Sequence, residues 1–80
     1  MNVYVIMTID GNGSEKLRKV VSSRAKADLF LQDMVVRYTR IGYTHQEILL
    51  ERVAYNKAHR FTLESTGEVL NYVVYKVGVE

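Results

Sequence analysis

The chain has 80 residues, no Cys and no Pro, and its 11 Lys and Arg against 9 Asp and Glu give a formal net charge of +2. This length predicts a single domain, residues 1–80, with a modest core. The lack of Cys excludes disulfides and thiolate ligation of zinc or iron–sulfur clusters, and it is typical of a cytoplasmic protein. The charge excess is too small to indicate nucleic-acid binding by itself, and no apolar run is long enough to span a bilayer, so we expect no membrane partner.

Two strands are expected at the start of the chain. Apolar residues alternate over residues 2–9, which predicts a strand whose buried face carries Val3, Val5, Met7 and Ile9. A second strand is predicted over residues 16–21, with Leu17 and Val21 facing the core and Lys19 interrupting that face. Together the two strands predict a hairpin.

The loop between these strands, within TIDGNGSEKL, has metal-like spacing. Asp10, Asn12 and Ser14 occupy the first, third and fifth positions of a calcium loop, but Glu15 and Val21 stand where that loop requires Gly and Glu. The glycines also lack the spacing of a phosphate-binding loop. Asp-Gly and Asn-Gly pairs are typical of tight turns, so we expect a hairpin turn and no metal site.

A helix is expected over residues 24–41. Ser22 and Ser23 can cap its start, and Gly42 can end it in a left-handed conformation. Apolar residues recur at a spacing of 3.6 and form one stripe, which predicts the side that packs on the core. The stripe comprises Ala27, Phe30, Leu31, Met34, Tyr38 and Ile41.

The stretch from residue 44 to residue 58 allows two interpretations. Thr44 and Glu47 fit the capping box of a helix. The apolar residues beyond them scatter around the helix circumference, which favours a strand over residues 47–55 instead. That strand would turn at Asn56 and Lys57 and pair with residues 58–64, where Phe61 points inward.

The last predicted strand, residues 68–77, is apolar on both faces. One face carries Val69, Val73, Tyr75 and Val77, and the other carries Leu70, Tyr72 and Val74. Such a strand is either central in its sheet or meets a partner. The order ββαβββ predicts an α+β fold in which a single long helix packs on one face of a small antiparallel sheet. We expect the uncovered face to carry Tyr4, Ile6, Leu70, Tyr72 and Val74.

Few residues suggest catalysis. His45 is expected in a loop and His59 at the start of a strand, so nothing in the sequence brings them together. The serines fall at turns and caps, where Ser has a local structural role. We therefore expect no enzyme, no catalytic residues, no bound metal and no cofactor.

An interaction surface is the leading hypothesis. Ala25, Leu29 and Val36 lie opposite the core stripe of the predicted helix, and apolar residues there indicate a partner surface. Together with the five residues of the uncovered sheet face, they predict binding to a protein partner or to a second copy, with a homodimer expected. The alternative is a nucleic-acid-binding module, because cations interleaved with aromatic rings contact phosphates and bases. Its residues would be Arg37, Arg40, Tyr43, Tyr55, Lys57, His59 and Arg60.

In size, and in having a single helix on a small sheet, the chain resembles short uncharacterised proteins encoded by bacteriophages and mobile elements. The resemblance covers the whole chain and involves no family motif. Many proteins of that kind block or redirect a host protein. The resemblance implies an inhibitor or modulator that acts by occupying the surface of its partner.

Overall fold

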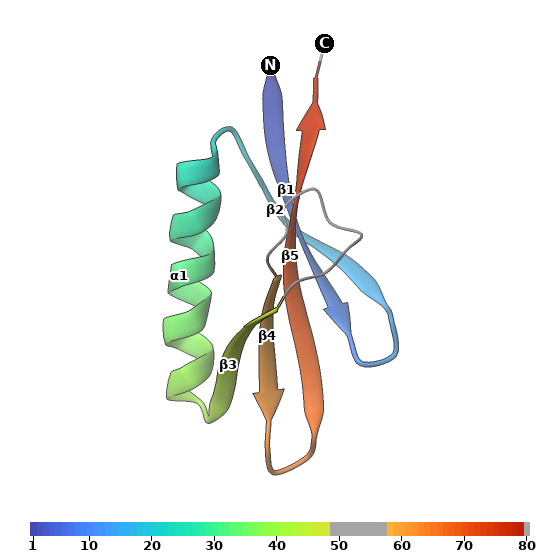
Figure 1. Cartoon of the computed structure of the whole chain (residues 1–80), viewed down its shortest axis with the longest axis vertical. Helices are drawn as coiled ribbons and strands as arrows, with labels where there is room; N and C mark the ends of the chain where they lie inside the picture. Colours follow the sequence, from blue (N-terminus) through green and yellow to red (C-terminus); the bar gives the residue numbers. More distant parts are fainter. Residues whose placement is uncertain (49–57, 80) are drawn as a thin grey trace.

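The computed structural model describes residues 1–48 and 58–79. Figure 1 shows one helix lying along one side of a twisted sheet. The elements follow the predicted order ββαβββ, so the predicted α+β class is confirmed. Their bounds are β1 Asn2–Asp10, β2 Glu15–Val21, α1 Arg24–Arg40, β3 Tyr43–Ile48, β4 Ala58–Leu63 and β5 Glu68–Gly78.

The five strands form one sheet in the order β2-β1-β5-β4-β3, and each adjacent pair is antiparallel. The last strand, β5, is the middle strand, as its apolar character on both faces predicts. The edges are β2 and β3. Because β5 pairs with β1, the two ends of the described chain lie side by side in Figure 1.

The turn between β1 and β2 is held by the side chain of Asp10. Its Oδ1 atom accepts hydrogen bonds from the backbone N–H groups of Asn12 and Ser14, both at 2.9 Å. Gly13 has a φ of 83°, a conformation that glycine adopts without steric cost. The predicted hairpin is therefore confirmed, and the carboxylate of Asp10 is used within the turn itself.

A bulge in β2 changes which side chains face the helix. Ile6 pairs with Lys19 and Met7 pairs with Leu17, so Arg18 is the extra residue on β2. Its Nε atom donates a hydrogen bond to Oγ1 of the buried Thr8 at 3.0 Å. The prediction that Leu17 faces the core is wrong, because the bulge places it opposite Met7, where it is 60% exposed.

The helix begins where its sequence predicts and ends one residue before the predicted position 41. The Oγ atom of Ser23 accepts a hydrogen bond from the backbone N–H of Lys26, which caps the first turn. Gly42, with a φ of 101°, follows the last turn. Ile41 was expected in the core stripe, but it lies beyond Arg40 as the C-cap residue and is 68% exposed. The rest of the predicted stripe packs in the core.

The helix covers the opposite sheet face from the one expected. Ile6, Phe61, Tyr72 and Val74 are buried together with Ala27 and Leu31 of α1, and Tyr4 and Leu70 pack against them. The other face carries a second apolar cluster, in which Ala58 and Val73 are buried among Met7, Ile9, Ile48 and Tyr75. Both β1 and β5 are apolar on two sides, so alternation alone does not reveal which side the helix covers.

The third strand differs from the prediction. The described residues place β3 at Tyr43–Ile48, paired from Tyr43 opposite Leu63 to Ile48 opposite Ala58. The predicted register, with a two-residue turn at Asn56 and Lys57, is therefore wrong. Most of the predicted strand 47–55, and that turn, lie outside the described residues.

Candidate functional site

The outer side of α1 carries exposed apolar side chains, as predicted. Leu29 is 66% exposed and Val36 is 46% exposed, and Ala25 is exposed on the same side. Much of the apolar surface of these side chains remains in contact with water, so a partner that covered it would gain hydrophobic stabilisation.

The five sheet residues predicted for the uncovered face lie elsewhere. Tyr4, Ile6, Leu70, Tyr72 and Val74 belong to the helix-covered core, and Ile6 has no exposed surface at all. The expectation that they form an open interface is wrong for a physical reason. The helix packs on the side of β1 and β5 that carries Tyr4 and Tyr72, and not on the side that carries Tyr75.

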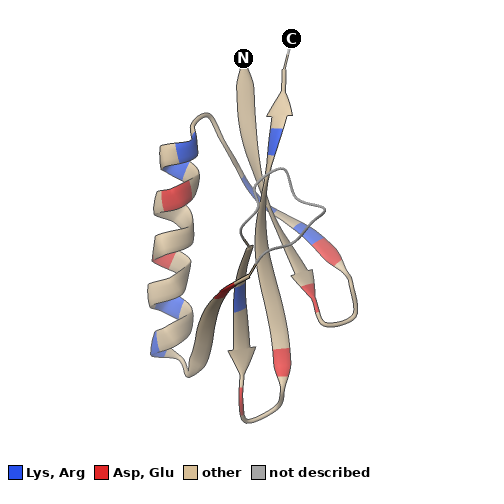
Figure 2. Cartoon of the chain, viewed as in Figure 1, with Lys and Arg blue, Asp and Glu red and all other residues tan. Residues whose placement is uncertain are grey.

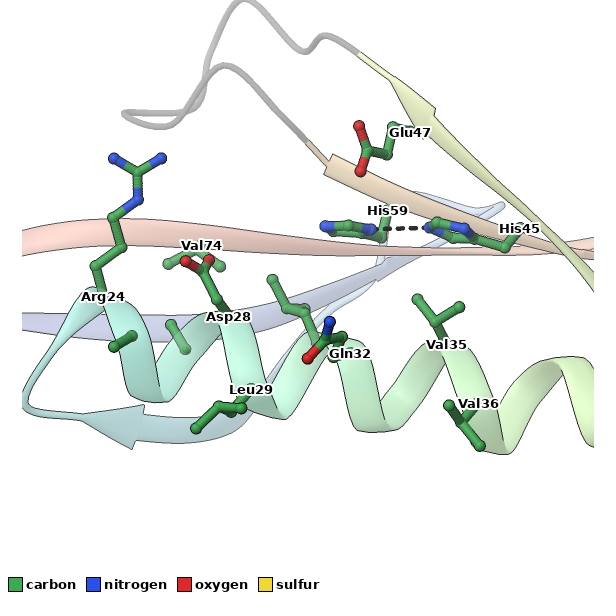
Figure 3. Close-up of a pocket in the computed structure, with 13 residues that line it drawn as sticks. Arg24, Asp28, Leu29, Gln32, Val35, Val36, His45, Glu47, His59 and Val74 are labelled. Carbon is green, nitrogen blue, oxygen red and sulfur yellow. Dashed lines mark hydrogen bonds between the residues drawn. The ribbon is translucent and has the colours of Figure 1, made fainter.

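A groove of about 860 Å³ lies between α1, from Arg24 to Val36, and the strands β3, β4 and β5. Ala27 and Leu31 of the helix and Val74 of β5 line its apolar part. Figure 3 shows Arg24, Asp28 and Val35 reaching toward the strands, whereas Leu29 and Val36 point to the opposite side of the helix. Leu29 and Val36 nevertheless border the groove at its outer edge, so the exposed apolar row is continuous with it.

Two histidines meet on the strand wall of the groove, contrary to the prediction. The Nε2 atom of His45 and the Nδ1 atom of His59 are 2.8 Å apart and share a hydrogen bond, and the rings stack with an interplanar angle of 13°. His45 pairs with Phe61 and Glu47 pairs with His59, so the two histidines are diagonal neighbours on one face. The prediction is wrong because His45 lies in β3 and not in a loop.

This contact restricts the protonation of the pair. One ring donates and the other accepts, so at least one imidazole is neutral while the bond exists. The charged groups that line the groove beside them are Glu47 of β3 with Arg24 and Asp28 of α1. The groove therefore combines an apolar floor with a few polar groups at its walls.

A cluster of aromatic rings fixes the helix to the sheet beside the groove. Tyr38 of α1 stacks on Phe61 with ring centroids 4.6 Å apart, and its hydroxyl lies 3.0 Å from that of Tyr72. Burial raises the pKa of the Tyr72 hydroxyl, and the hydrogen bond with Tyr38 raises this pKa further. The neutral hydroxyl pair is thus a rigid polar contact within an apolar layer.

The residues of the nucleic-acid alternative are not brought together where the structure describes them. Arg37 and Arg40 lie at the end of α1, and Tyr43 packs edge-on against Tyr38 in the aromatic cluster. Arg60 lies on the other sheet face, where it donates to Asn71, and His59 lies in the groove. Tyr55 and Lys57 lie outside the described residues. Figure 2 shows Lys and Arg dispersed over the helix and strands, with acidic residues among them.

The described residues, 1–48 and 58–79, contain neither a metal-binding cluster nor a membrane-spanning helix. No group of three or more His, Cys, Asp or Glu side chains among them is placed to hold a metal ion. No helix in these ranges has the length and apolar character that crossing a membrane requires.

Comparisons with other proteins give no relative. No protein-family model, curated protein or solved structure matches the chain. The residues and their geometry therefore carry the functional inference.

Proposed function

We propose that this protein is a non-enzymatic interaction module that binds a protein surface through the outer side of α1 and the adjoining groove. One observation carries the proposal: Leu29 and Val36 are exposed on the helix and are continuous with an apolar groove. An apolar row beside a concave apolar floor, with polar groups at the walls, is the anatomy of a protein-binding surface.

The polar groups of the groove are suited to holding a partner in place. Among the described lining residues they are two carboxylates, one guanidinium, one amide and two imidazoles bonded to each other. The carboxylate of Asp28 and the amide of Gln32 can contact polar groups of a bound chain, which fixes orientation and discriminates between partners. Binding of this kind fits a protein that acts by occupying the surface of its partner.

The test is a double variant, Leu29→Asp with Val36→Asp, compared with the unmodified protein by native mass and by affinity capture from a cell lysate. Both positions are exposed, so the fold tolerates the charges, and circular dichroism with thermal unfolding verifies this. We expect bound species to fall at least tenfold, because two charges at the contact must be desolvated.

Leu17→Asp is a control that adds one negative charge at another exposed apolar position. Leu17 is 60% exposed but lies on β2, away from the groove. It should keep whatever binding the unmodified protein shows. An unchanged native mass and unchanged capture in the double variant would overturn the proposal, and so would an equal loss in Leu17→Asp.

A further inference from the structure

One exposed ridge, which runs along α1 and ends at its C-cap residue Ile41, has a charge pattern that is complementary to itself when reversed. Leu29, Asp33, Arg37 and Ile41 succeed one another at intervals of four residues. Residues at this interval form one of the surface ridges through which helices pack on each other. Leu29 and Ile41 are 66% and 68% exposed, and the side chains of Asp33 and Arg37 are 53% and 70% exposed. The ridge therefore runs apolar, acidic, basic, apolar, and all four side chains face solvent.

A two-fold axis at the height of residue 35 makes this pattern complementary. Positions 29 and 41 lie equally far from residue 35, and so do positions 33 and 37. When two α1 helices pack antiparallel about this axis, Asp33 faces Arg37 of the second copy, and Leu29 faces Ile41 of the second copy. Each carboxylate faces a guanidinium, and each apolar side chain faces another apolar side chain. A contact of this kind is isologous and closes as a dimer.

The neighbouring side chains fit the same arrangement. Val36 is 46% exposed and lies at nearly the height of the axis, on the flank of the ridge that borders the groove. Within one chain, Nε of Arg37 already lies 3.0 Å from Oδ2 of Asp33. Two such pairs facing each other form a ring of four alternating charges, in which every carboxylate has two cationic neighbours.

We propose that the partner at the outer side of α1 is a second copy of this chain, bound through the ridge Leu29–Asp33–Arg37–Ile41. The inference rests on the proposed function and names the occupant of its surface. A contact confined to one 17-residue helix and its C-cap residue lies at the small end of stable interfaces. We therefore expect a weak dimer, with a Kd on the order of 100 μM.

The charge pattern allows a mixing experiment that a folding defect cannot imitate. In Asp33→Arg alone, cations face cations across the axis, and in Arg37→Asp alone, carboxylates face carboxylates. An equimolar mixture of the two variants restores every opposite-charge contact in the heterodimer. Sedimentation equilibrium up to about 1 mM protein, roughly ten times that Kd, measures the mean mass of each sample.

The expected masses follow directly. The unmodified chain should approach twice its monomer mass, each single variant should remain monomeric, and the mixture should recover the association of the unmodified chain. Glu15→Arg and Lys16→Asp on β2 are the matched controls, because they change the net charge by the same amounts outside the ridge. Each of these controls should dimerise alone.

Three results would overturn the proposal: a monomeric unmodified chain, undiminished association of both single variants, or a mixture that stays monomeric. If the mixture stays monomeric while Leu29→Asp with Val36→Asp still abolishes capture of another protein, the surface serves a different partner. In that case the proposed function stands and the homodimer falls.

Discussion

Leu29 and Leu31 of α1 are of the same residue type and lie two positions apart, yet one is exposed and the other is buried. Leu31 is 6% exposed and packs against the sheet, whereas Leu29 is 66% exposed on the other side of the helix. The inner side of α1 packs against the sheet, so substitutions there lower the free energy of unfolding. The outer side contributes little to the fold, so its apolar residues are available for a contact with another molecule.

The largest expected effect distinguishes these two sides directly. Leu31→Ala should lower the free energy of unfolding by about 2–5 kcal/mol, because it leaves a cavity in the core. Leu29→Ala should change it by less than about 0.5 kcal/mol. Urea unfolding of dilute protein measures both. Equal losses would contradict the assignment of the two sides.

A smaller effect is expected from the polar contact on the inner side. Tyr72→Phe removes the hydroxyl that Tyr38 contacts, and it should cost about 1–2 kcal/mol by leaving a part-buried hydroxyl without its partner. Burial raises the pKa of Tyr72 in the folded state, so its stabilising contribution is complete below about pH 10 and is lost as the pH rises further.

The pH dependence provides the check. Stability of the unmodified protein should fall above about pH 10, and this fall should be shallower in Tyr72→Phe. Tyr75 lies in the cluster on the other sheet face, and Tyr75→Phe should keep the steep fall. Parallel pH profiles for the unmodified protein and Tyr72→Phe would count against the assigned environment of Tyr72.

Loss of the helix cap should have an effect on stability between that of the inner side and that of the outer side of α1. Ser23→Ala should cost about 1 kcal/mol, because the backbone N–H of Lys26 loses its acceptor. Ser22→Ala, which removes only a contact with the side chain of Lys26, should be nearly neutral. Thermal unfolding compares the two variants, and a larger loss in Ser22→Ala would place the cap at the wrong serine.

The smallest effect is expected on the outer side. Arg37→Gln breaks the exposed ion pair with Asp33 and should cost the isolated chain about 0.3–0.5 kcal/mol at low salt, and less at high salt. Arg40→Gln, at the end of the same helix, should show a smaller salt dependence. If the free energy of unfolding of Arg37→Gln, measured on dilute protein, fell by more than about 1 kcal/mol, the outer side would contribute to the fold.

Local patterns in the sequence predict the elements well, since each depends on neighbours along the chain. The cap at Ser23, the stop at Gly42 and the turn at Asp10 are all local features, and each is confirmed. The covered face of the sheet could not be predicted in this way. Tyr4 and Ile6 alternate with Val3 and Val5, so both faces of β1 are apolar.

The candidate site was only half predictable. Leu29 and Val36 follow from the helical wheel, but the histidine pair depends on a strand pairing between distant parts of the chain. The spacing of Thr44 and Glu47 is also typical of a helix cap. The alternation of Tyr43, His45 and Glu47 on one face of β3 therefore does not by itself predict a strand there. Ile41 was assigned to the core because its spacing extends the stripe, although the helix ends one residue before it.

The pairing of β1 with β5 has a consequence for how the chain acquires its structure. Asn2 lies opposite Gly78, so the central ladder of the sheet joins the two most distant parts of the chain. The entropy of closing this long loop must be overcome before the ladder forms, which slows folding. During synthesis, the backbone groups on one edge of β1 remain unpaired until β5 has been made, because β5 is the partner of that edge. Removal of β5 would therefore cost the protein its whole fold, and not one strand.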